Sequence, residues 1–508
     1  MDIFSYLHIS AGDNNIYSHP WLVMLNEQRR MHPQISAFPN KYVYNHLLKD
    51  HESVKENRKD VFNREPLCGS PMNLIDLSGT YCAASKNSDN SRFNILSAVL
   101  SFATAITAED DAEKSIGIIT PYAAQTRLIR AMIQDYRKAK PSNIACSTVH
   151  QFQGSERNLI VFDAVESFPS TKPGWLMSKN DNGSVTRLIN VAVTRAKGKL
   201  VTVANSKFWL RKFDKTQHFF YRLVKYLMAR ENVVDVKDGV LREYIQHLTF
   251  GKNIKCYSGF EECQTALKKD LAKARDKKSI SIPDGQLESK SEKELLALLQ
   301  EQKINGIRIL MKSNDYATLP ETWKKYVWGS DEAMFPLLAI DDNVIWYGVP
   351  DSRLMFKDKD MGYTTICKII LRITGEHTIE ILKSLSDLEY RIVDGQRKPL
   401  HEKDEKDIKI DDEDGKGAAG LGKFVEEYAK CPKCKKPMKL TRSRAGKIFL
   451  KCSVCGELDY LKPDFTNWYI SKNSVKCPIH KCGLCAGVGK YGIYVKCDQG
   501  HYLKPDEI

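Results

Sequence analysis

The distribution of cysteine limits what this chain can fold into more than any other feature. Of 14 cysteines in 508 residues, eight lie after residue 430. Cys431 and Cys434 form one CxxC pair, Cys452 and Cys455 form a second, and the segment 435–451 separates the two pairs. Two CxxC turns at this separation can bring four thiolates to one Zn²⁺ ion, which explains them better than four unligated thiols do. The end of the chain is therefore predicted to fold around zinc.

A weak internal repeat predicts a second metal module. The segment IFLKC at 448–452 resembles IYVKC at 493–497, and each is followed by YLKPD, at 460–464 and at 502–506. The second copy holds more potential ligands than one Zn²⁺ ion uses. By the repeat, the expected ligands are Cys477, Cys482 and Cys497, with His501 or Cys485 as the fourth, and His480 is a further donor in the segment. We therefore expect two small zinc ribbons in tandem, similar to those at the C-termini of type IA topoisomerases.

Much of the net charge of +14 is concentrated at the same end of the chain. The segment 423–508 holds 17 Lys and Arg against 8 Asp and Glu, a net charge of +9, whereas the segment 1–422 carries +5. Aromatic residues alternate with these cations, a pattern that suits phosphate attraction and base stacking. The alternative is a solvated basic surface with the aromatic residues in small cores. We expect the ribbons to bind single-stranded nucleic acid.

The rest of the chain has the pattern of two α/β segments. Strand-like runs at 116–120, 159–165 and 200–205 alternate with helical patterns before residue 212. A nearby apolar run, 95–106, is shorter than the roughly 18 residues of a membrane span. The first residues lack the features of a signal peptide, so we expect a soluble, cytoplasmic protein. The predicted divisions are an α/β lobe at 1–212, a helical connector at 213–246, a second α/β domain at 247–398, a charged linker at 399–422, and ribbons at 423–470 and 471–508.

Four sequence blocks follow one another within the segment 1–212. They are NEQRRMHPQISAFPNKYVY (26–44), ITPYAAQ (119–125), STVHQFQGSE (147–156) and RLINVAVTRAKGKL (187–200). In order and approximate spacing they resemble the later motifs of superfamily 1 helicases, and most closely the superfamily 1B branch that includes the nonsense-mediated-decay helicase. A chance match of four such blocks in order is negligible. The resemblance implies that residues 1–212 form the second RecA-like lobe of a helicase.

The resemblance also implies roles for individual residues. Arg30 and Arg195 match the family's catalytic cations, which reach from the second lobe to the charge that develops on the γ-phosphate of ATP. Arg29 departs from the family pattern, where tyrosine is usual, so we expect altered stacking on the nucleotide base. For each arginine, the alternative is an ordinary ion pair with a carboxylate. The other matching positions are Gln28, Gln153, Gly154 and Glu156 for the nucleotide, and Thr120, Pro121, Tyr122, Gln125 and His150 for the nucleic-acid strand.

A helicase motor also needs a first lobe, with a GxxxxGK[ST] phosphate loop and an acidic pair that holds Mg²⁺. The match in this sequence, GAAGLGKF at 417–424, follows an acidic linker, and Phe424 replaces the required hydroxyl. We therefore interpret it as linker. Because the first block begins near residue 26, we expect no room for a first lobe upstream. ATP and Mg²⁺ would be shared with a lobe from an upstream segment or a partner chain.

Residues 257–394 resemble a phospholipase D–like unit in the layout of their strands and helices. Active members carry an HxKx₄D motif, in which His attacks phosphorus, Lys neutralises the phosphate and Asp orients the His. Counting back from Asp341, the Lys position is Pro336 and the His position is Met334. Neither residue can do this chemistry, so we expect a degenerate, non-catalytic domain.

Together, these patterns predict the C-terminal portion of an ATP-dependent superfamily 1 helicase that translocates on, or unwinds, single-stranded-tailed RNA or DNA. One alternative is a non-catalytic nucleic-acid-binding adaptor. Another is a phospholipase D–type nuclease, against which Met334 and Pro336 argue. The sequence does not distinguish RNA from DNA.

Overall fold

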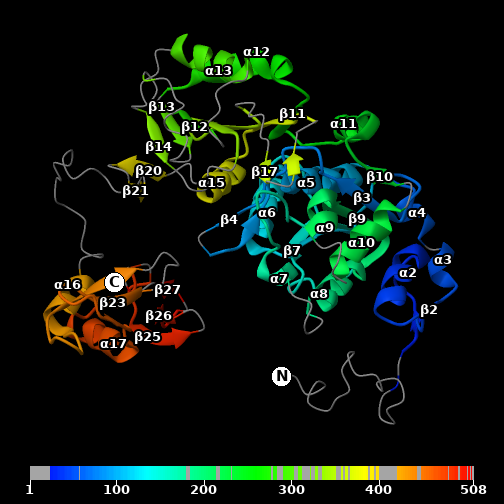
Figure 1. The fold of residues 1–508 in the computed structure, drawn as a ribbon. Coiled ribbons are helices and arrows are strands. Elements are labelled where there is room, and N and C mark those ends of the chain that lie inside the picture. The colour runs from blue at the N-terminus through cyan, green and yellow to red at the C-terminus, as the bar shows by residue number, and fades with distance from the viewer. Residues whose placement is uncertain are drawn as a thin grey trace. The chain divides into compact units, whose positions relative to one another are not determined.

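The computed structural model of the chain divides into two compact units, Met1–Glu402 and Lys403–Ile508, and each is described by itself (Figure 1). Within the described residues, no helix is both long enough and apolar enough to cross a membrane. The residues that the structure describes are 23, 25–56, 58–87, 89–178, 184–212, 218–229, 232–275, 278–282, 290–301, 307–311, 321, 326–329, 335–349, 356–358, 361–363, 367–386, 390–393, 396–399, 420–442, 448–478, 480–489, 492–499, 501–503 and 505.

A six-stranded sheet lies at the centre of the first part of unit 1, and all of its neighbouring strands are parallel. Strands β3 and β6 are buried along their whole length, as expected for a parallel sheet covered by helices on both faces. The predicted parallel α/β fold is confirmed for this part of the chain. The strand order is β10 (Val233–Val234), β3 (Met72–Asp76), β9 (Ala196–Ala204), β8 (Arg157–Asp163), β6 (Ile116–Thr120) and β7 (Ala145–Thr148).

Side chains alternate between the two faces of this sheet. On β8, Leu159 and Val161 belong to one buried cluster, whereas Ile160 and Phe162 belong to another. The apolar run at 95–106 lies in a helix against the first face, where every one of its residues is buried. The first face is covered by α5 (Ile95–Asp110) and α6 (Ala123–Arg137), and the second by α2 (Pro33–Tyr42), α8 (Ser184–Val193), α9 (Ser206–Lys212) and α10 (Phe219–Met228).

The segment predicted as a helical connector, 213–246, is built into this lobe through its described residues. Helix α10 packs its apolar side against the second face of the sheet. The short strand β10 then pairs in parallel with β3 and extends the sheet by one strand. The 3-10 turn η2 (Lys237–Gly239) and helix α11 (Val240–His247) follow, and Leu241 is buried in the first cluster.

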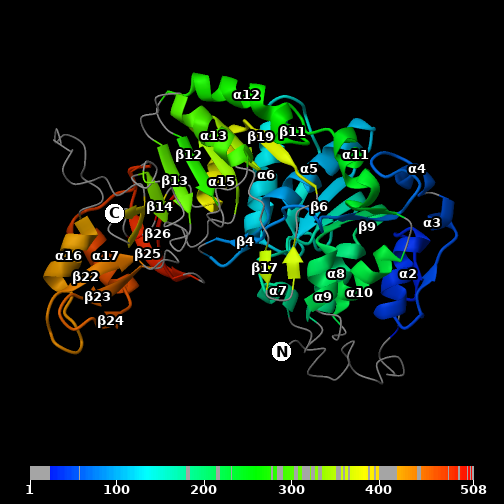
Figure 2. The same ribbon diagram turned by 45° about the horizontal axis from the view of Figure 1, so that its top comes forward.

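A second, seven-stranded sheet is mixed rather than parallel. Strand β12 pairs in parallel with β13 and antiparallel with β15, so the direction changes inside the sheet. The helices α12 (Phe260–Lys273) and α13 (Lys290–Glu301) lie together over one face (Figure 2). The strand order is β11 (Ile254–Tyr257), β19 (Ile370–Ile373), β16 (Val344–Tyr347), β15 (Leu337–Ile340), β12 (Lys278–Ile282), β13 (Ile307–Met311) and β14 (Val327–Gly329).

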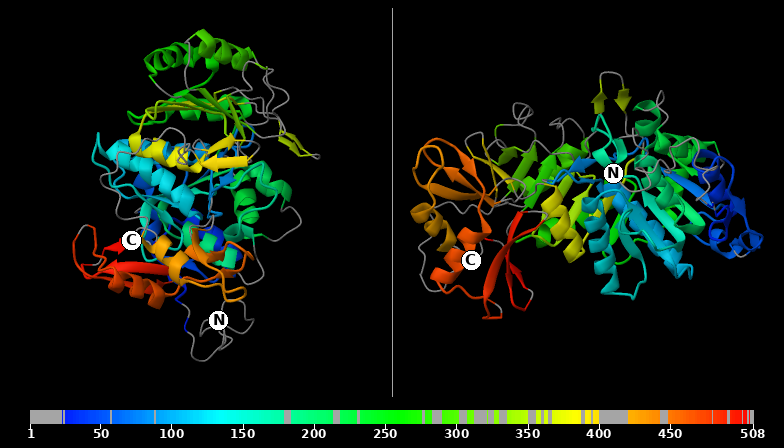
Figure 3. Two further views of the ribbon diagram at one scale, coloured as in Figure 1. Left: turned by 90° about the vertical axis from the view of Figure 1, so that its left-hand side faces the viewer. Right: turned by 90° about the horizontal axis from the view of Figure 1, so that it is seen from below.

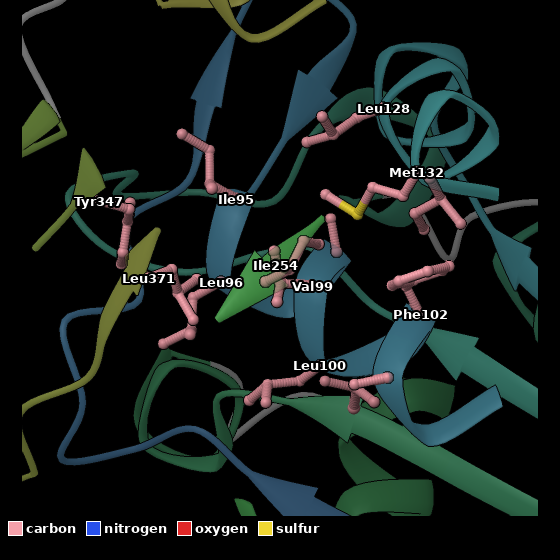
Figure 4. Packing of buried hydrophobic residues seen from close by; sticks show 14 of the residues in the cluster. Ile95, Leu96, Val99, Leu100, Phe102, Leu128, Met132, Ile254, Tyr347 and Leu371 are labelled. Atoms are coloured by element: carbon pink, nitrogen blue, oxygen red, sulfur yellow. The ribbon is translucent and has the colours of Figure 1, made fainter. Parts of the chain in front are cut away.

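The two sheets share one hydrophobic core. Leu338 of β15 packs with α12 and α13, whereas its neighbours Leu337 and Ala339 belong to the cluster that contains α5 and α6. Helix α15 (Glu376–Leu385) lies beside α6 in this shared layer (Figure 3). Figure 4 shows Ile254, Tyr347 and Leu371 of the second sheet pointing toward side chains of α5 and α6. The lobe and the second α/β domain are therefore joined by buried apolar surface as well as by the chain.

Asp135, near the end of α6, joins the two parts by hydrogen bonds. One carboxylate oxygen accepts from the backbone N and Oγ1 of Thr378 at 2.9 and 2.7 Å, and the other from the backbone N and Nδ1 of His377 at 3.1 and 2.8 Å. These donors lie in the first turn of α15, where exposed N–H groups favour an anion. Burial raises the pKa of the Asp135 carboxyl, but the hydrogen bonds from Thr378 and His377 outweigh it and lower the pKa below its ordinary value.

We expect Asp135→Asn to lower the free energy of unfolding of unit 1 by about 1.5–3 kcal/mol at neutral pH, because it removes charge-assisted hydrogen bonds at a buried junction. A lowered carboxyl pKa stabilises the fold above the unfolded pKa, and this contribution is lost as pH falls through the folded pKa. The variant should therefore lose part of the acid sensitivity of the native chain in denaturant titrations below pH 4. The matched control is Lys138→Gln at the neighbouring exposed pair with Glu376, which should change little. Equal stability of Asp135→Asn and the native chain would contradict the role of this junction.

Unit 2 is small and is held by two three-stranded antiparallel sheets. Its apolar core includes Phe424, Val425, Tyr469 and Ile470, together with buried cysteines. Residues 420–422 were predicted as linker but begin a helix, and 401–419 lie outside the described residues. The elements are α16 (Gly420–Tyr428), β22 (Met438–Arg442), β23 (Ile448–Cys452), β24 (Leu458–Asp459), α17 (Pro463–Lys472), β25 (Leu484–Gly489), β26 (Gly492–Cys497) and β27 (Tyr502–Leu503).

Shorter elements complete unit 1. They are β1 (Glu27–Gln28), β2 (Lys49–Asp50), α3 (Ser53–Glu56), α4 (Lys59–Phe62), β4 (Ser85–Lys86), β5 (Arg92–Phe93), α7 (Trp175–Ser178), β17 (Phe356–Asp358), β18 (Met361–Tyr363), β20 (Tyr390–Val393) and β21 (Gln396–Pro399).

Candidate nucleotide site and metal centres

Two predicted nucleotide-site residues meet at one edge of the parallel sheet. Arg30 follows β1 and leads into α2, and its Nε lies 2.5 Å from Oε2 of Glu156, the residue just before β8. The Arg30 guanidinium also donates to the carbonyl of Thr194 at 3.5 Å. Both side chains are partly exposed. The fold thus brings together two residues that are 126 positions apart in the sequence.

Arg195 stands at the same edge, in the turn between α8 and β9. Its Nη1 donates to the carbonyl of Ser155 at 3.3 Å, but its Nε is buried and has no hydrogen-bond partner among the described residues. Burial and the nearby charge of Arg30 lower the pKa of the Arg195 guanidinium. A buried donor without an acceptor is costly in a protein interior, so this atom is suited to a ligand that brings an acceptor.

Lys197 is a third cation of this site, and sequence reasoning did not select it. Its Nζ lies 2.6 Å from Oε1 of Glu156. The hydrogen bond from Lys197 lowers the pKa of the Glu156 carboxyl, burial opposes this shift, and Arg30 lowers the pKa further. The clue was present in TRAKGK, because residues two apart at the start of a strand share a face. We call Arg30, Arg195 and Lys197 the cation cluster.

The connection between β7 and β8 explains how the third sequence block reaches both edges of the sheet. His150 stands just after the carboxyl end of β7 and is exposed, whereas Glu156 stands just before the amino end of β8. Between them, Phe152 is buried across β6. A Cβ atom at Gly117 of β6 would lie 2.6 Å from Cζ of Phe152, so a glycine is needed there.

We expect Gly117→Ala to destabilise unit 1 by about 1–3 kcal/mol, because it overpacks the contact with Phe152. The added methyl would also meet Cδ1 of Ile160 at 2.9 Å. The matched variant is Gly117→Ala combined with Phe152→Leu, which should recover part of the lost stability because the two positions touch. Denaturant titration of the native chain and both variants measures the effect. A double variant no more stable than Gly117→Ala alone would show that this contact is not the cause.

Gln28, Gln153 and Gly154 were also predicted to contact the nucleotide, and they lie in different environments. The Gln28 amide accepts from the backbone N of Arg30 and Met31 at 2.9 and 2.8 Å, and so fixes the loop that carries Arg30. Gln153 and Gly154 are exposed in the turn before Glu156. Arg29 is exposed and pairs with Glu27 at 3.0 Å. The neighbouring arginines therefore have different partners, because Arg29 pairs with Glu27 and Arg30 pairs with Glu156.

The block predicted to contact the strand lies at the opposite, carboxyl edge of the sheet. Thr120, Pro121, Tyr122 and Gln125 are all buried. Tyr122 donates its hydroxyl to Glu166, and burial raises the pKa of this phenol. These side chains thus take part in internal packing, and their contact with nucleic acid stays a prediction.

Gln125 illustrates how polar side chains are satisfied at this edge. Its Nε2 donates to Oδ2 of Asp163 at 2.7 Å, and its Oε1 accepts from the backbone N of Asn94 at 2.8 Å. Burial raises the pKa of Asp163 to about 6, although the hydrogen bond from Gln125 opposes this shift. The Gln125 side chain is therefore engaged in internal hydrogen bonds, whereas the buried Oγ1 of Thr120 at the same edge has no hydrogen-bond partner among the described residues.

The four cysteines of the first predicted metal site lie close together in the structure. The ligand atoms of all four cysteines lie within 4.8 Å of one another, and the Sγ atoms are 3.5 Å apart in the pair Cys431–Cys455 and 3.4 Å apart in the pair Cys434–Cys452. Four thiolates bound tetrahedrally at about 2.3 Å from Zn²⁺ would be about 3.8 Å apart. The residues present therefore fit a zinc ion without rearrangement of the backbone.

In the second module the ligand atoms that lie together include two of those expected from the repeat, Cys477 and Cys497. Cys477, His480 and Cys497 bring their ligand atoms within 4.8 Å of one another. Cys482 is not in this group, because it lies beyond the turn, where its carbonyl accepts from the backbone N of Cys477 at 3.0 Å. Cys485 is exposed, and its thiol donates to a backbone carbonyl at 3.7 Å.

Neither the phosphate-loop match nor the phospholipase D–type motif positions are suited to binding a phosphate. The match to a phosphate loop at 417–424 ends in α16, where Phe424 is buried in the core of unit 2. In the second domain, Pro336 directly precedes β15, and its carbonyl accepts from the backbone N of Gly348. Met334 lies outside the described residues.

Known proteins resemble the first part of the chain. Residues 13–207 match a family model described as "AAA domain". Helicase sen1 of Schizosaccharomyces pombe is 31% identical over 187 residues, which cover 36% of this chain and 11% of that protein. DNA polymerase alpha-associated DNA helicase A of the same yeast is 31% identical over 244 residues, covering 45% of this chain and 34% of that protein. The regulator of nonsense transcripts 1 homolog of Neurospora crassa is 33% identical over 193 residues, covering 36% of this chain and 17% of that protein.

These matches and the parallel sheet are consistent with a RecA-like type of α/β lobe. More particularly, the first part of the chain is similar in sequence to superfamily 1 helicases. The chain spans between about a tenth and a third of the length of these three relatives. Among solved structures, NucT from Helicobacter pylori is 12% identical and covers 26% of this chain and 91% of that chain, but a TM-score of 0.19 supports no conclusion.

Proposed function

We propose that residues 1–212 form the second lobe of an ATP-driven superfamily 1 helicase and complete its nucleotide site. The observation that carries this proposal is the cation cluster around Glu156, with the Nε of Arg195 beside it, for which the described part of the chain offers no hydrogen-bond partner. Cations placed where charge develops on a transferred phosphoryl group are the main means by which such enzymes accelerate hydrolysis. In this proposal Arg30 and Arg195 act on the phosphates of ATP.

Glu156 has a different part in the proposal. As an anion between Arg30 and Lys197, it holds two cations at fixed positions and offsets their mutual repulsion. Gln28 fixes the loop before Arg30 by accepting backbone hydrogen bonds. ATP and Mg²⁺ would be held mainly by a first lobe with a phosphate-binding loop, which an upstream segment or another chain supplies. We call this chain together with that lobe the two-lobed protein.

The proposed substrate is a single strand of RNA or DNA, along which ATP hydrolysis moves the two-lobed protein. Unit 2 would provide an additional grip. Tyr460 and Tyr502 are 83% and 60% exposed, and Trp468 is 43% exposed. Exposed rings on a basic surface are suited to stacking of bases beside phosphate contacts.

The second α/β domain is proposed to be a non-catalytic platform. It is continuous with the core of the lobe through β15, β16 and α15, and its expected nucleophile and phosphate positions carry Met334 and Pro336. We expect no metal-independent phosphodiesterase activity from the native chain, and measurable activity would overturn this assignment.

The test is nucleic-acid-stimulated ATP hydrolysis by this chain and by the chain extended with upstream coding sequence. We expect turnover in the two-lobed protein and none from this chain alone. Fluorescence anisotropy with labelled single strands measures strand binding in the same samples. Strand binding without ATP turnover in the extended chain would overturn the helicase proposal and favour a non-catalytic adaptor.

A further inference from the structure

The two modules of unit 2 use the same backbone turn, and this identifies equivalent positions. In the first module, Lys435 N donates to the carbonyl of Cys431 at 3.0 Å, and Cys431 N donates to the carbonyl of Lys436 at 2.8 Å. Lys435 has a φ of 60°, in the left-handed region. Cys434 N lies 3.5 Å from Sγ of Cys431, so the turn aims a backbone donor at the first thiol.

The second module repeats each of these features. Lys481 N donates to the carbonyl of Cys477 at 2.9 Å, and Cys477 N donates to the carbonyl of Cys482 at 3.0 Å. Lys481 has a φ of 54°. His480 N lies 3.4 Å from Sγ of Cys477. The turn that follows the first ligand is therefore the same in both modules.

This equivalence fixes the second ligand. His480 occupies the position of Cys434, and Cys482 occupies the position of Lys436, which cannot be a ligand because its ammonium has no lone pair. The following strands agree, because Met438 pairs with Cys452 as Leu484 pairs with Cys497. The sequence repeat had placed a ligand at Cys482 because it compared residue types rather than turns.

The second turn is equivalent but shorter. Cys452 N donates to the carbonyl of Glu457 at 2.8 Å, and Cys497 N donates to the carbonyl of His501 at 2.9 Å. The turn after Cys497 is thus one residue shorter than the turn of the first module that carries Cys455. The longer side chain of His501 compensates, since its Nδ1 lies 3.4 Å from Sγ of Cys477, as Sγ of Cys455 lies 3.5 Å from that of Cys431.

The remaining contact closes the correspondence. Nδ1 of His480 lies 3.4 Å from Sγ of Cys497, and in the first module Sγ of Cys434 lies 3.4 Å from Sγ of Cys452. Thus the two contacts between turns that fit Zn²⁺ in the first module recur in the second module. There, Nδ1 of His480 takes the place of Sγ of Cys434, and Nδ1 of His501 takes the place of Sγ of Cys455.

We infer that the second module is a Cys₂His₂ zinc site, and that Cys482 and Cys485 are not ligands. Sulfur and imidazole nitrogen in a four-membered set are a usual structural donor set for Zn²⁺. With two thiolates instead of four, the bound centre has a net charge of about zero instead of about −2. Three of the proposed ligands are Cys477, His480 and Cys497, whose ligand atoms lie within 4.8 Å of one another. The fourth is His501, which lies outside that group of three but has its Nδ1 3.4 Å from Sγ of Cys477. This inference does not depend on ATP hydrolysis by the protein.

Metal analysis of the purified full chain tests the ligand set. We expect about two Zn²⁺ per chain for the native protein, and the same content for Cys482→Ser and Cys485→Ser. His480→Ala and His501→Ala should each lower the content to about one. Loss of one Zn²⁺ in Cys482→Ser, with full content in His480→Ala, would overturn the inference.

Cobalt spectra of the full chain distinguish a lost ligand from a failure to fold. Co²⁺ in place of Zn²⁺ absorbs in proportion to the number of bound thiolates, so six thiolates are expected over the two sites. His480→Cys should keep both ions and add the absorbance of one thiolate. An unchanged spectrum in His480→Cys would contradict ligation by this position.

Discussion

Arg195→Ala is expected to lower nucleic-acid-stimulated ATP turnover of the two-lobed protein by about 10³-fold, the scale of loss when an arginine at a transferred phosphoryl group is removed. The physical reason is the position of the side chain. Its Nε is buried with no partner among the described residues, and the charge of Arg30 and burial both disfavour its charged form. We expect the effect in kcat rather than in the KM for ATP, because the charge it opposes develops during the reaction.

Two comparisons separate this role from a structural one. Arg195→Lys should remain strongly impaired, since an ammonium cannot reproduce the planar guanidinium donors. Denaturant titration should show little loss of stability in Arg195→Ala, because among the described residues Nε has no acceptor to lose, and the one carbonyl that loses its donor belongs to the partly exposed Ser155. A large loss of stability, together with a proportional loss of all activities, would indicate that Arg195 supports the fold instead.

Cys452→Ser is expected to remove one Zn²⁺ from the chain and to unfold the first ribbon. Structural zinc in small modules contributes roughly 10–16 kcal/mol of apparent binding free energy at neutral pH, and this energy is coupled to folding. Cys431 and Cys452 are part of the small apolar core of unit 2, which includes α16 and the first ribbon. Without the metal, the three short strands of the first ribbon bury too little surface to remain folded.

Limited proteolysis and metal content of the full chain measure this effect. We expect cleavage within 430–460 in Cys452→Ser and in native chain treated with a strong chelator. The matched control is Cys68→Ser, because Cys68 is an exposed cysteine in unit 1, outside the two clusters of possible metal ligands found among the described residues. Full protection of Cys452→Ser from protease would contradict a zinc-dependent fold.

Local sequence patterns predicted much of the fold correctly. Buried strands such as β6 and β15 stand out as apolar runs, and the alternation of strand-like and helix-like segments indicates an α/β fold. The shared core was not predictable in the same way. Leu337 and Leu338 face different helices, and which helices these are depends on contacts between segments that are far apart in the sequence.

The candidate nucleotide site was predicted in part for a similar reason. Arg30, Glu156 and Arg195 were selected through motif resemblance, and the fold brings them together. Lys197 was missed because no motif position marks it, although it lies only two residues after Arg195, at the start of β9. For Gln125, the sequence could not show that the side chain would donate a hydrogen bond to Asp163 inside the fold.

The metal sites show where a sequence repeat misleads. Residues Cys482 and Cys485 have the right chemistry for zinc, but the turn after Cys477 puts His480 at the second ligand position. The sequence did contain a signal for this position, because CPKC at 431–434 aligns with CPIH at 477–480.

The central claim is that cations of this lobe act on the phosphates of ATP, and ATP turnover by Arg29→Ala and Arg30→Ala in the two-lobed protein tests it most directly. These neighbours have the same charge and chemistry, but Arg29 pairs with Glu27 at the surface and Arg30 lies at Glu156 in the cation cluster. The account predicts near-native turnover for Arg29→Ala and a loss of at least about 10²-fold for Arg30→Ala. Equal turnover of the two variants would contradict it.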